Sequence, residues 1–415
     1  MSNDFSKIKV RPCNRCLFAV LRCAVQFYFF LSGIRISSTN KCGKAPEGPS
    51  IVLCNHGSFF DFLYAGILLQ KSNPHFIIAR LYFYHKWLSR LLALLGGFPK
   101  SMFAMDMEST KNTLRVLHDG GVLAMMPEAR LSTVGKFEDI QENTYSFLKK
   151  AGVPVYTIQI HGSYFAKPKW GKGLRRGSVV ESKLDLLFSA EDLNSMSVHD
   201  IKKNVEEQLY YDEFQWLQTK PEIHYHSKRL AEGLENILTI CPVCKQRHTI
   251  TTKGRDIFCE HCGKLTSLDS RYAFSSDFRF RNFAQWYEWQ KSVMQTQISH
   301  DPNYSLCSDV ELRLPSSDGK SLTRTAGNGV CTLDRSGLTY AGTRDGSPYT
   351  ISFPIKRVYR LLFGAGENFE IYNGSEILYF VPAEKRSSVD WYLTSMILYD
   401  ESMKQPVLST DTASE

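Results

Sequence analysis

The chain has 415 residues, enough for about two to four domains with cores of their own. Hydrophobic residues make up 43% of it and charged residues 22%, which are ordinary values for a globular protein. The net charge is +8, and residues 1–50 supply most of it, with eight lysines and arginines against Asp4 and Glu47. Because the rest of the chain is near neutral, we expect no nucleic-acid partner.

The N-terminal segment, residues 1–35, combines this basic charge with an apolar stretch. Leu17–Ile34 is 18 residues long and contains Arg22 and Gln26. A membrane-spanning helix needs about 20 apolar residues, and a central arginine costs about 2.5–3.5 kcal/mol. The stretch therefore predicts an amphipathic helix that lies on anionic lipid at a membrane surface. A signal peptide, for which no clear cleavage site follows, and a helix buried in its own domain are the alternatives.

In the next predicted domain, residues 36–236, short apolar runs alternate with helical patterns. The expected strands are Ile51–Cys54, His75–Ala79, Val122–Met126 and Val153–Ile160. The expected helices are Phe59–Gln70, Lys86–Leu95, Ser109–His118 and Glu142–Lys150. This alternation is typical of an α/β fold. Acidic and polar residues over 189–213 predict a solvated helical end to the domain.

A histidine and an aspartate stand five residues apart where the first strand meets the first helix. His56 can take a proton near neutral pH, and Asp61 can orient the imidazole and stabilise its cation. Ser58 suits the helix N-cap, which places Asp61 at the third helical position. On one helix His56 and Asp61 would lie roughly 140° apart, so we expect His56 in the turn before it. The alternative is a capping box of Ser58 and Asp61 beside a loop histidine.

Two C-x-x-C pairs stand in residues 237–270, with 14 residues between them. They consist of Cys241, Cys244, Cys259 and Cys262. Each pair can present two thiolates on one tight turn, so the spacing predicts a zinc ribbon with a tetrahedral S4 site. Cysteine fills all four positions and leaves none open for catalysis, which indicates a structural zinc. Two disulfides or an iron–sulfur site are the alternatives.

Residues 271–300 are dense in aromatic side chains and predict a helical connector. Its stripe of Phe283, Trp286, Tyr287 and Met294 is expected to pack in a core rather than to bind a ligand.

Residues 301–403 change to short alternating runs separated by turn residues. The expected strands are Gly329–Leu333, Leu338–Tyr340, Tyr349–Phe353, Val358–Phe363, Phe369–Tyr372 and Ile377–Val381. Asp-Gly at 345–346 and Asn-Gly at 373–374 mark turns, and a helix around Trp391 closes the region. This pattern predicts an all-β domain, a small barrel or sandwich capped by a helix, and it resembles a pleckstrin-homology (PH) or GRAM-like fold. The Ser/Thr-rich residues 404–415 are expected to be disordered.

The segment 55–61 reads N-H-G-S-F-F-D and keeps every fixed position of N-H-x-S-x-x-D. It resembles the hallmark of the glycerolphosphate acyltransferase family, in particular of the 1-acyl-glycerol-3-phosphate acyltransferases. Residues 126–132, M-P-E-A-R-L-S, resemble the family's P-E-G-R block, and V-P-V at 153–155 resembles another. K-W at 169–170 and R-R-G at 175–177 fit the closing segment of that domain. The resemblance covers about residues 36–215.

The second block would bind the substrate's phosphate. If the strand path continues, Glu128 and Arg130 point the same way, and Arg130 can hold a phosphate through two hydrogen bonds. Glu128 would repel phosphate, so we expect it to contact a glycerol hydroxyl or to hold Arg130. A surface ion pair at a strand end is the alternative. Ala129 replaces the family's glycine, which makes the backbone less free.

The resemblance implies further substrate-binding residues. Lys100, in G-F-P-K at 97–100, stands in for a family arginine, and Arg80 occupies a position that is commonly basic. Asn55 and Ser58 are carried over from the first block.

The resemblance also implies the reaction. His56 and Asp61 would be the catalytic pair, and an acyl thioester, either acyl-CoA or acyl-carrier protein, would give its acyl group to the free hydroxyl of 1-acyl-glycerol-3-phosphate without a catalytic metal. Glycerol-3-phosphate or another lysophospholipid is the alternative acceptor, and a catalytically silent membrane adaptor is the alternative function.

The order of domains resembles a bacterial-type multidomain member that is peripheral or monotopic at the cytoplasmic face of the membrane. A cytosolic domain argues against disulfides between the four cysteines.

Overall fold

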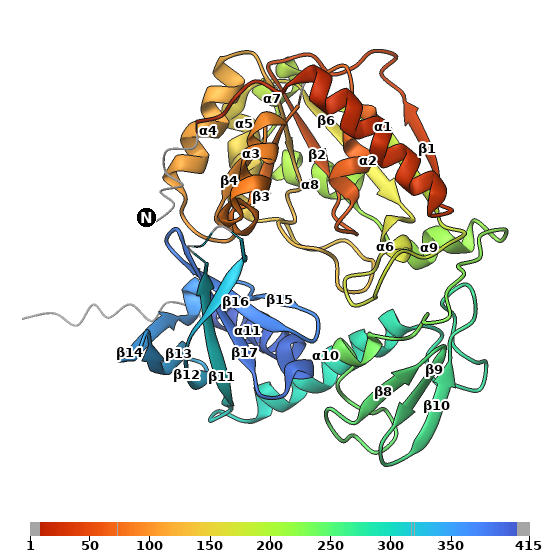
Figure 1. Cartoon of the computed structure of the whole chain (residues 1–415), viewed down its shortest axis with the longest axis vertical. Coiled ribbons are helices and arrows are strands. Elements are labelled where there is room, and N and C mark those ends of the chain that lie inside the picture. The colour runs from red at the N-terminus through yellow and green to blue at the C-terminus, as the bar shows by residue number, and fades with distance from the viewer. Residues whose placement is uncertain (1–8, 73, 317, 319, 405–415) are drawn as a thin grey trace, which may run out of the picture.

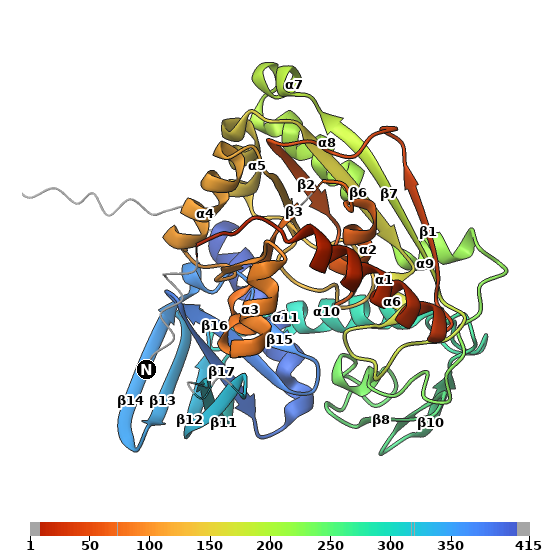
Figure 2. The same ribbon diagram turned by 45° about the horizontal axis from the view of Figure 1, so that its top comes forward.

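The computed structural model describes residues 9–72, 74–316, 318 and 320–404, which contain three β-sheets (Figures 1 and 2). Residues 1–8 of the expected membrane-associated segment and residues 405–415 of the expected disordered tail lie outside this description. Lys404, which was assigned to that tail, is instead the last residue of a helix.

The first sheet has seven strands in the order β1-β7-β6-β2-β5-β3-β4. They are β1 Arg35–Asn40, β2 Ser50–Cys54, β3 Pro74–Ala79, β4 Phe98–Lys100, β5 Val122–Met125, β6 Val155–His161 and β7 Val179–Phe188. Neighbouring strands are parallel except for β6 and β7. The α/β prediction is confirmed. Strands β1, β4 and β7 were not predicted: β1 is almost entirely exposed and β4 has only three residues, whereas the polar residues that alternate with the buried positions of β7 hide its apolar pattern.

Helices cover both faces of this sheet (Figure 2). They are α1 Arg15–Leu31, α2 Asp61–Leu68, α3 Lys86–Leu94, α4 Met107–His118, α5 Glu142–Ala151, α6 Ser163–Ala166, α7 Ala190–Ser195, α8 Val198–Leu209 and α9 Glu213–Gln218, with the 3-10 turn η2 at Arg80–Tyr84. In the central strand β2, Ile51 and Leu53 pack with α5 and α8, whereas Val52 and Cys54 pack with α1 and α2. A strand buried on both faces reads as a continuous apolar run, which is why β2 was predictable.

Helix α1 lies on the sheet through Phe29, which is fully buried. Its exposed apolar side chains are Val20, Phe27, Tyr28, Phe30 and Leu31. In the part of the chain that the structure describes, no helix has the length and apolar character that crossing a membrane requires.

The second sheet belongs to the predicted ribbon. Its antiparallel strands β8 Ile250–Lys253, β9 Asp256–Cys259 and β10 Gly263–Ser267 follow the 3-10 turn η3 at Leu234–Asn236. Cys241 and Cys244 precede these strands, Cys259 ends β9, and Cys262 lies in the turn before β10. Helix α10, Phe283–His300, then runs to the third sheet (Figure 1). The four residues of its predicted core stripe are all buried, which confirms their packing role.

The third sheet is antiparallel throughout, in the order β14-β13-β12-β11-β17-β16-β15. Its strands are β11 Leu306–Pro315, β12 Thr323–Leu333, β13 Gly337–Arg344, β14 Ser347–Pro354, β15 Leu362–Gly364, β16 Asn368–Asn373 and β17 Glu376–Pro382. Helix α11, Ser388–Lys404, closes it, and η4 Ile355–Arg357 and η5 Lys385–Ser387 are 3-10 turns. The strand expected at Val358–Phe363 is wrong, because only β15 pairs there. The expected turn at 345–346 is confirmed, with both residues at positive φ.

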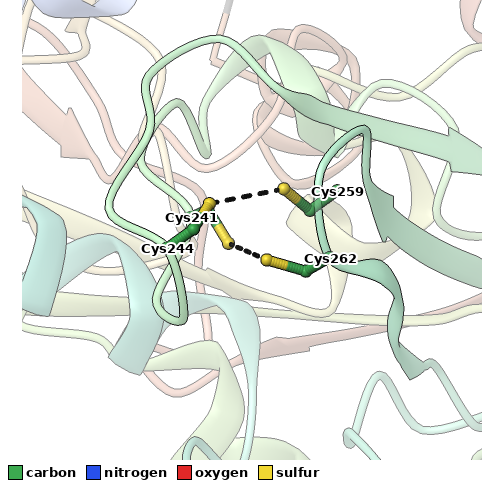
Figure 3. A group of neighbouring side chains, drawn as sticks. All are labelled: Cys241, Cys244, Cys259 and Cys262. Carbon is green, nitrogen blue, oxygen red and sulfur yellow. Dashed lines mark hydrogen bonds between the residues drawn. The ribbon is translucent and has the colours of Figure 1, made fainter.

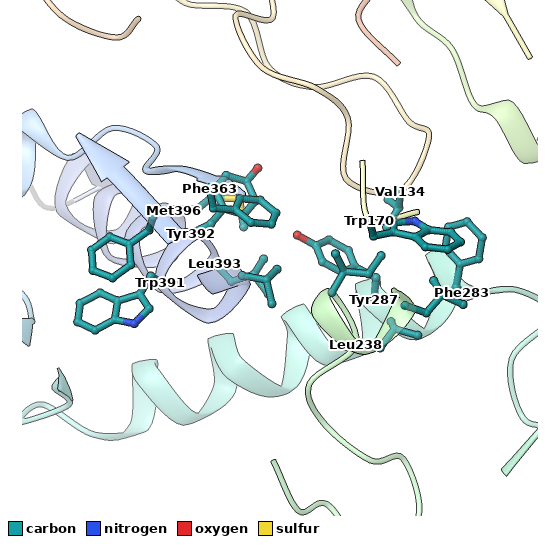
Figure 4. Packing of buried hydrophobic residues seen from close by; sticks show 14 of the residues in the cluster. Val134, Trp170, Leu238, Phe283, Tyr287, Phe363, Trp391, Tyr392, Leu393 and Met396 are labelled. Carbon is teal, nitrogen blue, oxygen red and sulfur yellow. The ribbon is translucent and has the colours of Figure 1, made fainter. Parts of the chain in front are cut away.

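One hydrophobic core joins all three sheets. It runs from Trp170 beside the first sheet, through Leu238 near the ribbon and Phe283 of α10, to Trp391 of α11 (Figure 4). Tyr287 of α10 lies between the two ends of this group in the picture. The α/β part and the C-terminal β-region are therefore packed against each other through a shared core and are not joined by a flexible linker alone.

Candidate active site

His56 and Asp61 meet in the turn between β2 and α2. The imidazole Nδ1 lies 3.2 Å from Asp61 Oδ2, and the same oxygen accepts a hydrogen bond from the Ser58 N–H at 2.7 Å. Asp61 is fully buried, whereas the His56 side chain is 18% exposed. His56 stands before the helix, as expected, so its Nδ1 faces the carboxylate and its Nε2 is the nitrogen left for another partner.

The expected N-cap is wrong. Helix α2 begins at Asp61 itself, and its cap position is Phe60, whose side chain caps nothing. Asp61 reaches back to the Ser58 N–H instead, and the Ser58 hydroxyl donates to the Lys167 carbonyl at 3.0 Å. A carboxylate in the first helical turn is favourable on electrostatic grounds, so the helix needs no serine cap.

Asn55 ties β2 to β6. Its amide nitrogen donates to the Ile160 carbonyl at 2.8 Å, and its oxygen accepts the Ile160 N–H at 2.7 Å. The Asn55 side chain is fully buried, and both its oxygen and its nitrogen are hydrogen-bonded to backbone groups. Asn55 and Ser58 therefore both stabilise the backbone in this structure.

The Glu128 carboxyl accepts hydrogen bonds from two backbone N–H groups, one in the His56 turn and one in the loop that contains Glu138. Its Oε1 accepts the His56 N–H at 2.8 Å, and its Oε2 accepts the Glu138 N–H at 2.9 Å. The carboxyl is fully buried, and this burial raises its pKa to about 8 against the lowering effect of the two N–H donors. Glu128 therefore joins the His56 turn to the loop that contains Glu138.

The extended path expected through Glu128 and Arg130 is wrong. The chain turns at Ala129, whose N–H bonds to the Met126 carbonyl at 3.1 Å and whose φ is 55°. This left-handed conformation costs a residue with a Cβ about 1–2 kcal/mol, and glycine avoids that cost. The turn sends the two side chains to different partners.

Arg130 points toward the C-terminal β-region. Its Nε donates to Glu138 Oε2 at 3.1 Å, and its guanidinium lies 5.6 Å from the Phe103 ring and 6.0 Å from the Tyr392 ring. The side chain is only 4% exposed, and its Nη1 is buried with no hydrogen-bond partner among the described residues. One donor of this cation therefore has no acceptor among the described residues.

Arg80 and Lys100 lie together at the ends of β3 and β4. Arg80 donates to Asp106 at 2.7 Å and to the Ser101 hydroxyl at 3.0 Å, so a buried carboxylate already matches its charge. The Lys100 ammonium has no ion-pair or hydrogen-bond partner in the described ranges, and burial lowers its pKa. Of these two cations, only Lys100 has no direct partner in the described ranges, so it is the one that could bind an anion.

Sequence reasoning missed two charged residues of this region. Glu138 belongs to no recognised block, yet it holds Arg130. Lys169, in the K-W pair, has its ammonium 3.4 Å from the centre of the Phe363 ring, and burial lowers its pKa to about 7, while Glu138 and Glu370 raise it. The Lys169 contact has no local signal because Phe363 is far away in sequence, and the contact between Arg130 and Glu138, which are 8 positions apart, follows no motif or helical spacing.

The four cysteine sulfurs converge (Figure 3). All lie within 4.8 Å of one another, and the closest pairs across the two turns are Cys241–Cys262 at 3.9 Å and Cys244–Cys259 at 3.7 Å. A disulfide needs about 2.05 Å, and all four cysteines are free thiols. A tetrahedron with Zn–S bonds of about 2.3 Å has edges of about 3.8 Å, so the donor set fits zinc.

Comparison with known proteins finds a family match in the part of the chain that forms the first sheet. Residues 35–161, which include His56 and Asp61, match the family model described as Acyltransferase. The curated proteins include no match to the chain. Among solved structures, the chain is similar to the 1-acyl-sn-glycerophosphate (LPA) acyltransferase PlsC from Thermotoga maritima. The match has 20% sequence identity and a TM-score of 0.39, and it covers 46% of this chain and 76% of that chain.

Replacing Glu128 by glutamine is expected to lower the free energy of unfolding by about 2–3 kcal/mol. A carboxyl group accepts both backbone N–H bonds in either protonation state, whereas the amide nitrogen of glutamine would face one of the N–H donors. Urea denaturation of Glu128→Gln measures this loss. Glu191→Gln, on the exposed first turn of α7, is the control and should stay within about 0.5 kcal/mol of the wild type. Equal midpoints for Glu128→Gln and wild type would contradict the bridging role.

Proposed function

We propose that the acyltransferase domain moves a fatty acyl group from an acyl thioester, acyl-CoA or acyl-carrier protein, to the free hydroxyl of 1-acyl-glycerol-3-phosphate in phospholipid synthesis. The observation that carries the proposal is the His56–Asp61 pair, which lies inside the segment that matches the Acyltransferase model. A general base without a protein nucleophile suits attack by a hydroxyl of the substrate.

In the proposed reaction, Asp61 holds the Nδ1 proton of His56, so Nε2 is the basic nitrogen. Nε2 takes the proton of the acceptor hydroxyl while the hydroxyl oxygen attacks the thioester carbonyl. The tetrahedral intermediate then breaks its C–S bond, the acyl ester forms, and the thiolate leaves and takes up the proton from the imidazolium. Asp61 stabilises that cation between the two steps. Base catalysis of this kind contributes about 10²–10⁴-fold.

The phosphate of the acceptor would lie against Arg130 and Lys100. Arg130 offers its unpartnered Nη1, and Lys100 offers an ammonium that no carboxylate contacts directly in the described ranges, although the charge of Asp106 acts on it. Because Arg80 already donates a hydrogen bond to Asp106, it would attract the phosphate through its charge and not through direct contact. Glycerol-3-phosphate or another lysophospholipid would use the same cations, so parallel assays with these acceptors and both thioester donors identify the physiological pair.

His56→Ala is expected to lower the rate of acyl transfer by about 10²–10⁴-fold, because the base is removed. The assay uses purified enzyme, a lysophosphatidate acceptor and an acyl-CoA. His118→Ala is the matched control, since that imidazole is 88% exposed on α4, and it should keep wild-type turnover. Near-normal turnover by His56→Ala would refute the assigned base and favour a silent membrane adaptor.

We also propose that the four cysteines bind a structural zinc ion. Metal binding in such modules is worth about 10–16 kcal/mol, which compensates for a small core. Purified protein should contain stoichiometric zinc, and Cys244→Ser should lose most of it and melt at a lower temperature. Because the ribbon shares its core with α10 and α11, the loss should also reduce activity. Cys307→Ser, an exposed cysteine on β11, is the control. Full zinc retention by Cys244→Ser in metal analysis would rule out this ligand set.

Helix α1 would hold the enzyme on the cytoplasmic surface of the membrane. Its exposed apolar side chains would enter the interface while the basic residues of the segment face anionic lipid headgroups. The C-terminal β-region, PH/GRAM-like in its seven strands and closing helix, has no assigned ligand in this proposal.

Phe27→Ser/Phe30→Ser is expected to weaken binding to phosphatidylglycerol vesicles about tenfold or more, since two aromatic side chains leave the interface. Vesicle sedimentation measures the partition. Met403→Ser, an exposed apolar residue at the end of α11, should bind as the wild type does. A wild-type protein that stays in the supernatant would contradict membrane attachment through α1.

A further inference from the structure

The C-terminal β-region touches the acyltransferase domain at the loop that holds Arg130. The hydroxyl of Tyr392, on the buried face of α11, donates to Glu138 Oε2 at 3.1 Å. The same oxygen accepts the Arg130 Nε at 3.1 Å. Tyr392 and Arg130 therefore share one carboxylate oxygen, although Tyr392 lies on α11 and Arg130 lies in the loop after β5.

A second contact holds the neighbouring residue of this loop. Arg360, which is almost fully buried, donates to Asp139 at 3.1 Å and to Asp400 of α11 at 3.1 Å. Two consecutive loop residues, Glu138 and Asp139, are thus bound from the C-terminal side. Such paired anchoring restricts the loop far more than a single surface contact does.

The loop continues the connection to the catalytic turn. The Glu138 N–H donates to Glu128, and the other oxygen of Glu128 accepts the His56 N–H. An unbroken series of hydrogen bonds therefore runs from Tyr392 through Glu138 and Glu128 to His56.

In this arrangement one nitrogen of the Arg130 guanidinium lacks a hydrogen-bond acceptor among the described residues. Glu138 occupies Nε, while Nη1 is buried without an acceptor. A buried donor without a partner is unfavourable, and a phosphate oxygen beside it would remove that penalty. The direction in which Nη1 points depends on where Glu138 holds Nε, and Tyr392 helps to hold Glu138.

We propose that Tyr392 is a positioning residue of the acceptor site, through which the C-terminal β-region sets Arg130 for a phosphate monoester. The proposal rests on the proposed function and assigns to the C-terminal region a part in substrate recognition. Tyr392 acts through Glu138 and does not touch the reacting atoms.

The test uses the full-length chain and sn-glycerol 3-phosphate as the probe, with binding measured by titration calorimetry. Tyr392→Phe keeps the ring and removes the hydroxyl, and we expect affinity for the probe to fall about tenfold. The KM for the phosphate-bearing acceptor should rise by the same factor, with kcat and the KM for the thioester unchanged. In an Arg130→Gln background, Tyr392→Phe should have no further effect, since both act through one contact.

Tyr340→Phe is the matched control, because it removes a buried hydroxyl bond of 2.8 Å to the Thr343 carbonyl inside the same region. It should bind the probe as the wild type does. Arg360→Gln removes the second anchor and should weaken binding in the same direction as Tyr392→Phe.

Equal affinity of wild type and Tyr392→Phe, or no affinity of the wild type for the probe, overturns the inference. Tyrosine-dependent binding of the probe by a protein that transfers no acyl group would instead support the inference and reject the proposed reaction.

Discussion

The geometry of the candidate active site depends on the hydrogen bonds of the buried Glu128 carboxyl. This carboxyl lies between two loops and accepts one backbone N–H from each, beside a direct hydrogen bond from the Ser132 N–H to the His56 carbonyl at 2.9 Å. The position of His56 is therefore set by the protein before any substrate binds. A carboxyl that sequence reasoning assigned to the substrate has instead become part of the framework, and its burial is what makes the two hydrogen bonds strong.

The second and third sheets both help to hold the candidate active site in place. Asp390, at the start of α11, accepts hydrogen bonds from the Thr239 hydroxyl and the His248 imidazole, both at 2.7 Å. These residues flank the first cysteine pair, so the ribbon fixes one end of the helix that presents Tyr392. A structural metal far from the reacting atoms would in this way influence where Arg130 lies, through a helix rather than through charge.

Features with a local physical cause were predictable from sequence. The apolar run of β2, the motif spacing that places His56 against Asp61, and the turn at 345–346 each follow from neighbours in the chain. Features that depend on distant partners were not predictable. Glu138 looks like any loop glutamate until Tyr392 is placed beside it, and Ser58 was expected to be a cap because the distant partner of its hydroxyl, the Lys167 carbonyl, has no local signal.

The hydrogen bond between Tyr392 and Glu138 joins residues that are 254 positions apart in the chain. A ribosome releases the N-H-x-S-x-x-D turn and the Glu128 loop long before α11 emerges, and domains fold from the N-terminus during synthesis. A nascent or truncated chain can therefore contain His56, Asp61 and Glu128 while the tyrosine that meets Glu138 is still missing. In this molecule the 55–61 segment and the tyrosine that meets Glu138 are therefore synthesised at different times, and their connection can form only after α11 has left the ribosome.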